Sequence, residues 1–114
     1  MELTMLQGYP DRVGRRLIWA AWGNGPAPYV NTGTFATSGD PMDSGFIGFQ
    51  NYIDVVIPAM SVSGTYIVRG VPVHGGNRPQ IQLHWFTASS GTEVTNGTDL
   101  SAEEVQLAGF GGTF

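Results

Sequence analysis

The stretch QIQLHWFTA, residues 80–88, alternates between polar and apolar side chains with a period of two. In an extended strand, successive side chains point to opposite faces. The two faces predicted here are an apolar one, Ile81, Leu83 and Trp85, and a polar one, Gln80, Gln82 and His84. We expect the apolar face to pack on a core and the polar face to meet solvent or a neighbouring subunit.

Two other runs show the same extended character. Residues 15–22, RRLIWAAW, are apolar on both faces, which is typical of a strand that is central in its sheet or covered on both sides. Residues 52–59, YIDVVIPA, place three aliphatic side chains on one face, Ile53, Val55 and Ile57. Asp54 occupies the opposite face, which we therefore expect to be partly exposed to solvent.

The segments between these runs contain the other predicted strands and the turns that separate them. Residues 65–73, TYIVRGVPV, form a strand in which Gly and Pro indicate a bulge or an edge position. Residues 29–37 can hold a short strand, and residues 39–48 have the composition of a loop. Turn clusters rich in Gly, Asn, Ser and Pro separate these runs.

The last element has two interpretations. Ser101 and Glu104 match a capping box, which favours the start of a helix. Glycines end the pattern soon afterwards, so a final strand over residues 104–110 fits the rest of the domain better, and we favour it. Short strands separated by turn signals predict an all-β fold, a single-domain antiparallel β-sandwich or jelly roll. We expect an extended N-terminal arm over residues 1–11, a β-sandwich over 12–110 and a flexible glycine-rich tail over 111–114.

The composition excludes several classes of site and partner. The 114 residues contain no cysteine, so thiolate metal sites are excluded, and the net charge of −4 argues against nucleic-acid binding. No apolar run is long enough for a membrane helix. The amino terminus does not resemble a signal peptide, so we expect assembly in the cytoplasm. Charged residues make up only 12% of the chain, about half the usual share, and such a surface suits contact with other proteins.

Few residues have the pattern of a catalytic or cofactor site. His74 and His84 are the only histidines, and we expect both to be polar surface residues without a metal. Neither a nucleophile elbow nor a phosphate-binding loop occurs in the sequence. We therefore predict a non-enzymatic protein with no catalytic, cofactor-binding or metal-binding residues.

Asp43, in the tripeptide Asp-Ser-Gly, offers one catalytic alternative. This tripeptide is the signature of aspartic proteases, and the chain has the size of one subunit of a dimeric, retropepsin-like enzyme. In that class the aspartate follows an apolar strand, whereas here it follows TSGDPM, which has turn chemistry. The apolar segment ending in glycine that braces the catalytic loop is matched only by residues 67–70, in the wrong order. We place this alternative second.

Aromatic side chains offer another alternative, a carbohydrate-binding surface. The candidates for stacking on sugars are Trp19, Trp22, Tyr29, Tyr66, Trp85 and Phe86. Trp19 and Trp85 share their faces with Leu and Ile, so most of this set is more simply interpreted as core.

The combined loops and strands resemble the small β-sandwich or jelly-roll decoration (cement) proteins of tailed bacteriophage heads. The resemblance covers residues 8–109 and rests on GYPDRVGR (8–15), TSGDPMD (37–43), YIDVVIPAMSVSGTY (52–66), IQLHWF (81–86) and TDLSAEEVQLAGFG (98–111). It implies a structural virion protein that binds the major capsid protein on the outer capsid surface and stabilises the shell, commonly as a homotrimer. Related small domains occur in tails and head fibres, and these remain alternatives.

Two groups of residues are candidates for capsid or subunit contact besides the polar face of residues 80–84. The first is the apolar part of the arm, where Leu3, Met5, Leu6 and Tyr9 could pair with an exposed edge of the capsid protein or within their own domain. The second is the loop side chains Phe46, Ile47 and Phe49, which we expect a trimer to bury.

Overall fold

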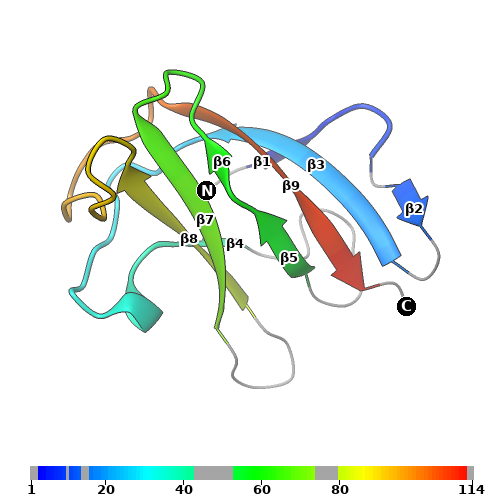
Figure 1. Ribbon diagram of the computed structural model, residues 1–114, viewed down its shortest axis with the longest axis horizontal. Coiled ribbons are helices and arrows are strands. Elements are labelled where there is room, and N and C mark those ends of the chain that lie inside the picture. The colour runs from blue at the N-terminus through cyan, green and yellow to red at the C-terminus, as the bar shows by residue number, and fades with distance from the viewer. Residues whose placement is uncertain (1–2, 10, 14–15, 43–52, 74–79, 113–114) are drawn as a thin grey trace.

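The computed structural model of the chain describes residues 3–9, 11–13, 16–42, 53–73 and 80–112. Figure 1 shows these residues as nine strands and one helical turn. The strands are β1 (Leu3–Met5), β2 (Asp11–Val13), β3 (Arg16–Asn24), β4 (Asp40–Met42), β5 (Ile53–Ile57), β6 (Ala59–Met60), β7 (Tyr66–Val73), β8 (Gln80–Thr87) and β9 (Glu104–Gly112). The helical turn is the 3-10 segment η1 (Phe35–Thr37).

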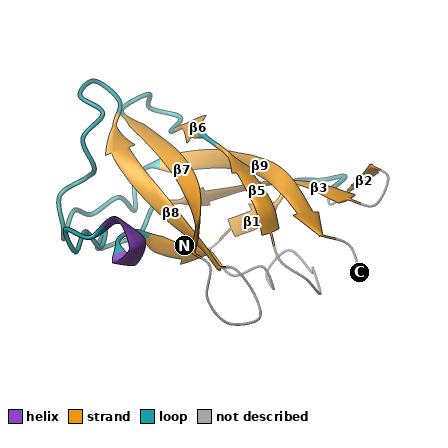
Figure 2. Cartoon of the chain, turned by 60° about the horizontal axis from the view of Figure 1, so that its bottom comes forward, coloured by secondary structure: helices purple, strands orange, loops and turns teal. Residues whose placement is uncertain are grey.

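The strands form two antiparallel sheets, which confirms the predicted all-β class and fits a single-domain β-sandwich. Sheet A has the order β1-β3-β9-β5, with β2 also paired to β3. Sheet B has the order β4-β8-β7-β6. β3 has the central place that its sequence predicted, since both of its edges are paired, but only one of its apolar faces is buried in the core, because Trp22 on the other is exposed. Figure 2 shows η1 and the longer loops gathered at one end of the strands.

The core lies between the two sheets. Its buried side chains come from both inner faces and from the loops at the same end of the sandwich: Trp19, Ala21, Tyr29, Met42, Val56, Val68, Ile81, Leu83, Trp85, Val94, Leu100, Val105 and Leu107. The prediction that Ile81, Leu83 and Trp85 face the core is confirmed, since each is at most 2% exposed. Trp19, Tyr29 and Trp85 are fully buried, so they have no free ring for a sugar.

The run predicted as one strand over residues 52–59 is two strands in different sheets. β5 pairs with β9 in sheet A, and after Pro58 the chain continues as β6, which pairs with β7 in sheet B. The register between β5 and β9 shifts between Ile53 and Val55, as at a β-bulge. An extra residue reverses which side chains face inward. Val56 therefore enters the core, whereas Val55 and Ile57, predicted on one apolar face, are nearly half exposed.

Three boundaries differ from the sequence-based expectations. Residues 29–37 form no strand, and their chain reaches η1 through turns. Residues 40–42, expected in a loop, form β4 and pair with β8. Near the C-terminus, β9 confirms the strand predicted over residues 104–110, and it continues to Gly112. Residues 111 and 112 thus pair with β3 and are not part of a flexible tail.

Candidate interaction surface

The outer side of sheet A carries rows of side chains that run across its strands. Residues directly opposite one another in an antiparallel pair share a face. The register therefore aligns Val55, Phe110 and Ile18 in one row, which ends at Asp11 in β2. We call this the Phe110 row.

A second row lies two residues further along each strand. It contains Ile57, Ala108 and Ala20, aligned by the same pairings. Both alanines are partly exposed. We call this the alanine row, and its side chains are much shorter than those of the Phe110 row.

The third row lies on the far side of the alanine row and contains Trp22. Trp22 is opposite Gln106 in β9 and Thr4 in β1. Met60 and Val62 also lie at this end of the sheet, beside β9. The residue between them, Ser61, is buried and forms an isolated β-bridge with Val105. Alternation then turns Met60 and Val62 outward. We call this the Trp22 row, with Met60 and Val62 at its margin.

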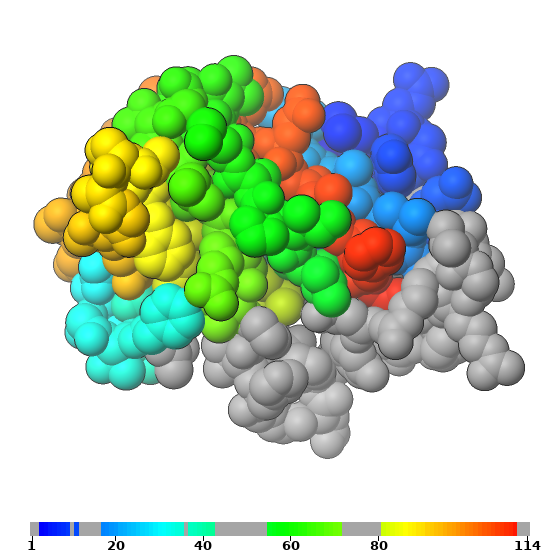
Figure 3. Space-filling view, in the orientation of Figure 1, coloured from blue at the N-terminus to red at the C-terminus, as the bar shows by residue number. Residues whose placement is uncertain are grey.

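Together these rows make an unusually apolar surface, which we call the outer apolar face. It comprises Ile18, Ala20, Trp22, Val55, Ile57, Met60, Val62, Ala108 and Phe110. Nine large hydrophobic side chains are exposed among the described residues, and six of them belong to this face. In Figure 3 the atoms of β5 (green), β9 (orange to red) and β3 (light blue) lie side by side on the side turned to the viewer. Such clustering, rather than the exposure of single residues, marks a surface that another molecule covers.

Charge on this face lies at its margins. Among the side chains that the structure describes there, the charged ones are Asp11, at the end of the Phe110 row, and Glu104, opposite Asn24 beyond the Trp22 row. The centre of a protein interface is typically depleted in charge, with polar residues at its rim. The outer apolar face has that arrangement.

The amino-terminal arm pairs within its own domain. Leu3, Thr4 and Met5 form β1, whose partners are residues 21–23 of β3, and Leu6 continues this contact by donating its N–H to the Ala20 carbonyl at 2.9 Å. Leu3 and Met5 pack against the core. Of the two alternatives left open for the arm, the structure shows pairing within its own domain for residues 3–6. Tyr9 remains 41% exposed and available for contact.

His84 corrects the prediction of a polar outer face on β8. It is fully buried, and its ring stacks on Phe35 of η1 with the ring centroids 4.2 Å apart. The loop that precedes β4 covers this part of sheet B. The alternation of residues within β8 gives no information about a loop that packs on it from elsewhere in the chain. Gln82 is half-buried, and the backbone of Gln80 is paired with that of Val73.

Burial also determines the protonation state of His84. Desolvation lowers the pKa of His84 below its usual range, although Glu93 opposes this effect. Its Nδ1 lies 3.4 Å from Glu93 Oε2. Neither ring nitrogen has a hydrogen-bond partner within the described part of the chain. The imidazole is thus held neutral, and it packs against the Phe35 ring.

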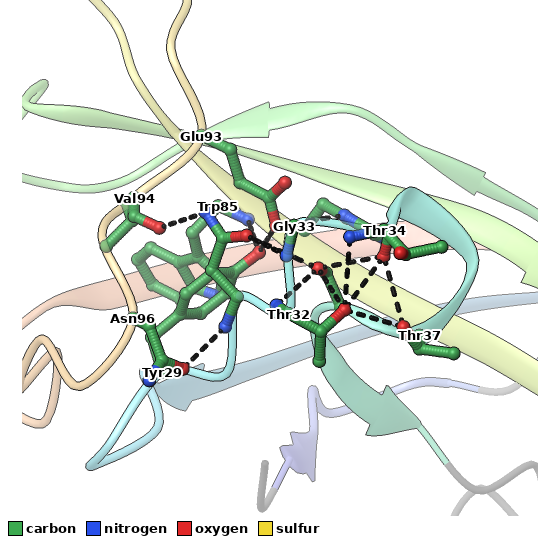
Figure 4. Close-up of polar contacts among 12 residues, drawn as sticks. Tyr29, Thr32, Gly33, Thr34, Thr37, Trp85, Glu93, Val94 and Asn96 are labelled. Atoms are coloured by element: carbon green, nitrogen blue, oxygen red, sulfur yellow. Dashed lines mark hydrogen bonds and ion pairs between the residues drawn. The ribbon is translucent and has the colours of Figure 1, made fainter.

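Glu93, which lies near His84, is also hydrogen-bonded to Tyr29 in the core, and Figure 4 shows the contact between Glu93 and Tyr29. The Tyr29 hydroxyl donates a hydrogen bond to Glu93 Oε2 at 2.7 Å and accepts one from the Trp85 backbone N–H at 3.1 Å. Burial, followed by the bond to Glu93, raises the pKa of Tyr29 well above its usual value, which keeps the hydroxyl protonated. This cluster joins residues far apart in the sequence and holds the loop end of the sandwich together.

The segment 31–38 is fixed by its own polar side chains, which are also drawn in Figure 4. The buried Ser38 hydroxyl donates to the Thr34 carbonyl and accepts the Thr32 N–H, both at 3.0 Å. Asn31 anchors the segment to the opposite loop by donating its side-chain amide to the Val94 carbonyl at 3.0 Å. These bonds satisfy the polar groups of a loop without regular pairing, and they explain why the strand expected over residues 29–37 does not form.

The remaining candidates lie outside the described residues. These are Phe46, Ile47 and Phe49 of the loop, together with Asp43 and His74. One objection to a catalytic Asp43 is met in part, because a strand, β4, directly precedes it, although its residues are Asp-Pro-Met and not an apolar run. The other objection stands, since residues 67–70 lie within β7 and pair with β8.

Comparisons with known proteins give no relative. The chain matches no family model, no curated protein and no solved structure. Within the described residues, none of the helical structure is long and apolar enough to cross a membrane.

Proposed function

We propose that this protein is a structural component of a protein shell, a decoration protein that binds the outer surface of a phage capsid and stabilises it. The observation that carries the proposal is the outer apolar face, which gathers six of the nine exposed large hydrophobic side chains of the described residues and has no charge at its centre. The resemblance of residues 8–109 to decoration proteins supplies the identity of the shell. The major capsid protein is the proposed partner.

The energetics of a repeated lattice suit a surface of this kind. Each apolar contact stabilises by about 25 cal/mol for every Å² of area removed from water. A small interface is weak alone, but occupancy rises steeply when linked copies bind neighbouring sites. The low proportion of charged residues reduces the electrostatic repulsion between crowded copies.

Co-sedimentation with phage heads tests this proposal. The heads are assembled from the major capsid protein of a tailed phage, once in the compact form and once expanded. We expect the protein to sediment with expanded heads and to raise the temperature at which they release their contents. If expanded heads bind none of the protein at saturating concentration, the proposal fails.

The aspartic protease stays as a second candidate because β4 directly precedes Asp43. It predicts cleavage of peptides at acidic pH, which Asp43→Asn abolishes without changing the circular dichroism spectrum. The shell proposal predicts no cleavage by either protein, so the same peptide digest separates the two functions.

A further inference from the structure

We propose that residues 31–39, which we call the strap, form an acid-sensitive cover over the outer side of sheet B. The strap is closed while His84 is neutral, and it lifts when His84 binds a proton. It runs through η1 and ends directly before β4. This inference goes beyond the proposed function and does not rest on it, because it concerns sheet B and not the outer apolar face of sheet A.

The strap encloses the His84 ring. His84 lies between Leu83 and Trp85 in β8, and both of these face the core, so His84 projects from the opposite side of sheet B. The Phe35 ring of η1 covers it, with the ring centroids 4.2 Å apart. Gly39 closes the edge at Nε2, since a Cβ atom added to Gly39 would lie 3.3 Å from that nitrogen. His84 is therefore fully buried although it lies on the outer side of the sheet.

A second proton on the ring has no acceptor under the closed strap. A neutral imidazole carries one N–H group, whereas an imidazolium carries two. The Nδ1 atom faces Glu93 Oε2 at 3.4 Å, but Nε2 faces the backbone of Gly39. Neither ring nitrogen has a hydrogen-bond partner in the part of the chain that the structure describes. Because a buried charged donor without a partner is strongly unfavourable, the protonated ring needs water, which reaches it when the strap lifts.

The charged groups around His84 act in opposite directions. Glu93, in the loop after β8, favours the protonated ring, whereas Arg69 of β7, directly opposite His84 in the register, disfavours it. A further carboxylate, that of Asp40 in β4, acts on Tyr29. The strap itself contains no charged residue. Desolvation outweighs the effect of Glu93, so the pKa of His84 lies below its usual range while the strap is closed.

The strap can move as one piece. Every hydrogen bond that residues 32–38 make with the described part of the chain stays within the strap. At its base, Gly39 donates its N–H to the Val30 carbonyl at 2.8 Å, and Asn31 is bonded to the loop after β8. The middle of the strap contacts sheet B through the ring stack described above. Loss of that stack therefore frees the middle of the strap while its base stays attached.

Proton binding and opening of the strap are therefore coupled. When the strap is open, His84 is in water and has the ordinary histidine pKa of about 6.5. The open form thus binds the proton more tightly than the closed form, and a ligand shifts a population toward the form that it binds better. The closed form is favoured above about pH 6.5, and the open form gains population as the pH falls below that value.

A nuclear magnetic resonance titration from about pH 8 to about pH 5 tests the inference. At the higher pH, we expect nuclear Overhauser cross peaks between the rings of Phe35 and His84. These cross peaks should disappear as His84 becomes protonated. The near-ultraviolet circular dichroism of the buried Trp19 and Trp85 should stay constant over the same range, because the core between the sheets does not open.

Two variants separate the trigger from the cover. His84→Gln cannot titrate at this position, so the contact between residues 35 and 84 should no longer depend on pH. Phe35→Ala removes the cover and keeps the titrating ring, so the midpoint of the His84 titration should rise toward about 6.5. Val30→Ala is the matched control, because Val30 is exposed to nearly the same extent as Phe35, and it should leave the midpoint unchanged.

Three results would overturn the inference. The first is a contact between Phe35 and His84 that persists once His84 is protonated. The second is a contact that is lost only together with the near-ultraviolet signal, because that result would show unfolding of the whole domain and not opening of the strap. The third is a His84 midpoint that is the same in the wild-type protein and in Phe35→Ala.

Discussion

Removing one hydroxyl from the core tests how the loop end of the sandwich is held. Tyr29→Phe keeps the buried ring and creates no cavity, so packing is preserved. It deletes the 2.7 Å hydrogen bond to the Glu93 carboxylate and leaves the Trp85 N–H, now without its 3.1 Å partner, buried. A hydrogen bond to a charged group contributes about 1.5–3 kcal/mol, and an unsatisfied buried donor costs about 1–3 kcal/mol.

These contributions overlap, because both describe the loss of one hydroxyl, and together they predict a loss of about 3 kcal/mol in the free energy of unfolding. For a domain of this size, such a loss lowers the melting temperature by about 12 °C. Urea denaturation at pH 7 and low micromolar concentration measures the change, with the m-value expected to stay constant.

The control is Tyr9→Phe, which removes a hydroxyl from a side chain that is 41% exposed. We expect that variant to change the free energy of unfolding by less than about 0.5 kcal/mol. A loss below about 1 kcal/mol for Tyr29→Phe, or equal losses for both variants, would show that the Tyr29–Glu93–Trp85 cluster does not hold the loops in place.

Two further changes probe the packing of the sheets. A methyl group in Gly109→Ala would overlap the Val55 carbonyl oxygen and lie 2.9 Å from the Trp19 ring, so we expect a loss of about 1–3 kcal/mol in thermal denaturation; unchanged stability would contradict the close approach of β5 to β9. For His84, the lowered pKa means that the unfolded chain binds a proton before the folded one does. The free energy of unfolding should therefore fall as the pH drops below about 6.5, with a limiting slope of about 1.4 kcal/mol per pH unit. His84→Gln should reduce this slope, whereas an equal slope in the variant and the wild-type protein would place the buried proton acceptor elsewhere.

The strands that alternate regularly could be predicted from the sequence. β3 and β8 were expected at nearly their observed positions, because burial on one or both faces determines their pattern directly. The final strand was also predicted correctly, although the capping box at Ser101 and Glu104 favoured the start of a helix. In the structure Ser101 instead donates its N–H and hydroxyl to Asp99, which lowers the pKa of that carboxyl.

The candidate surface could not be predicted in the same way. The bulge in β5 inverts the faces of Val55 and Ile57, and a register shift depends on the partner strand, not on the local pattern. His84 was wrongly predicted to be on the surface, because the side chain that stacks on it is Phe35, 49 positions earlier in the chain. Only pairing between β3, β5 and β9 brings Trp22, Val55 and Phe110 together, and that pairing is long-range.

Hydroxyl-radical footprinting tests most directly whether the outer apolar face is covered in the assembled shell. Oxidation of Trp22, Met60 and Phe110 is compared by mass spectrometry between the dilute free protein and the protein bound to expanded heads. Phe35 is the internal reference, since it is 45% exposed and lies on the other sheet. Our account predicts strong protection of Trp22, Met60 and Phe110 on heads with Phe35 unchanged. Equal oxidation of Trp22 and Phe110 in the two states would contradict it.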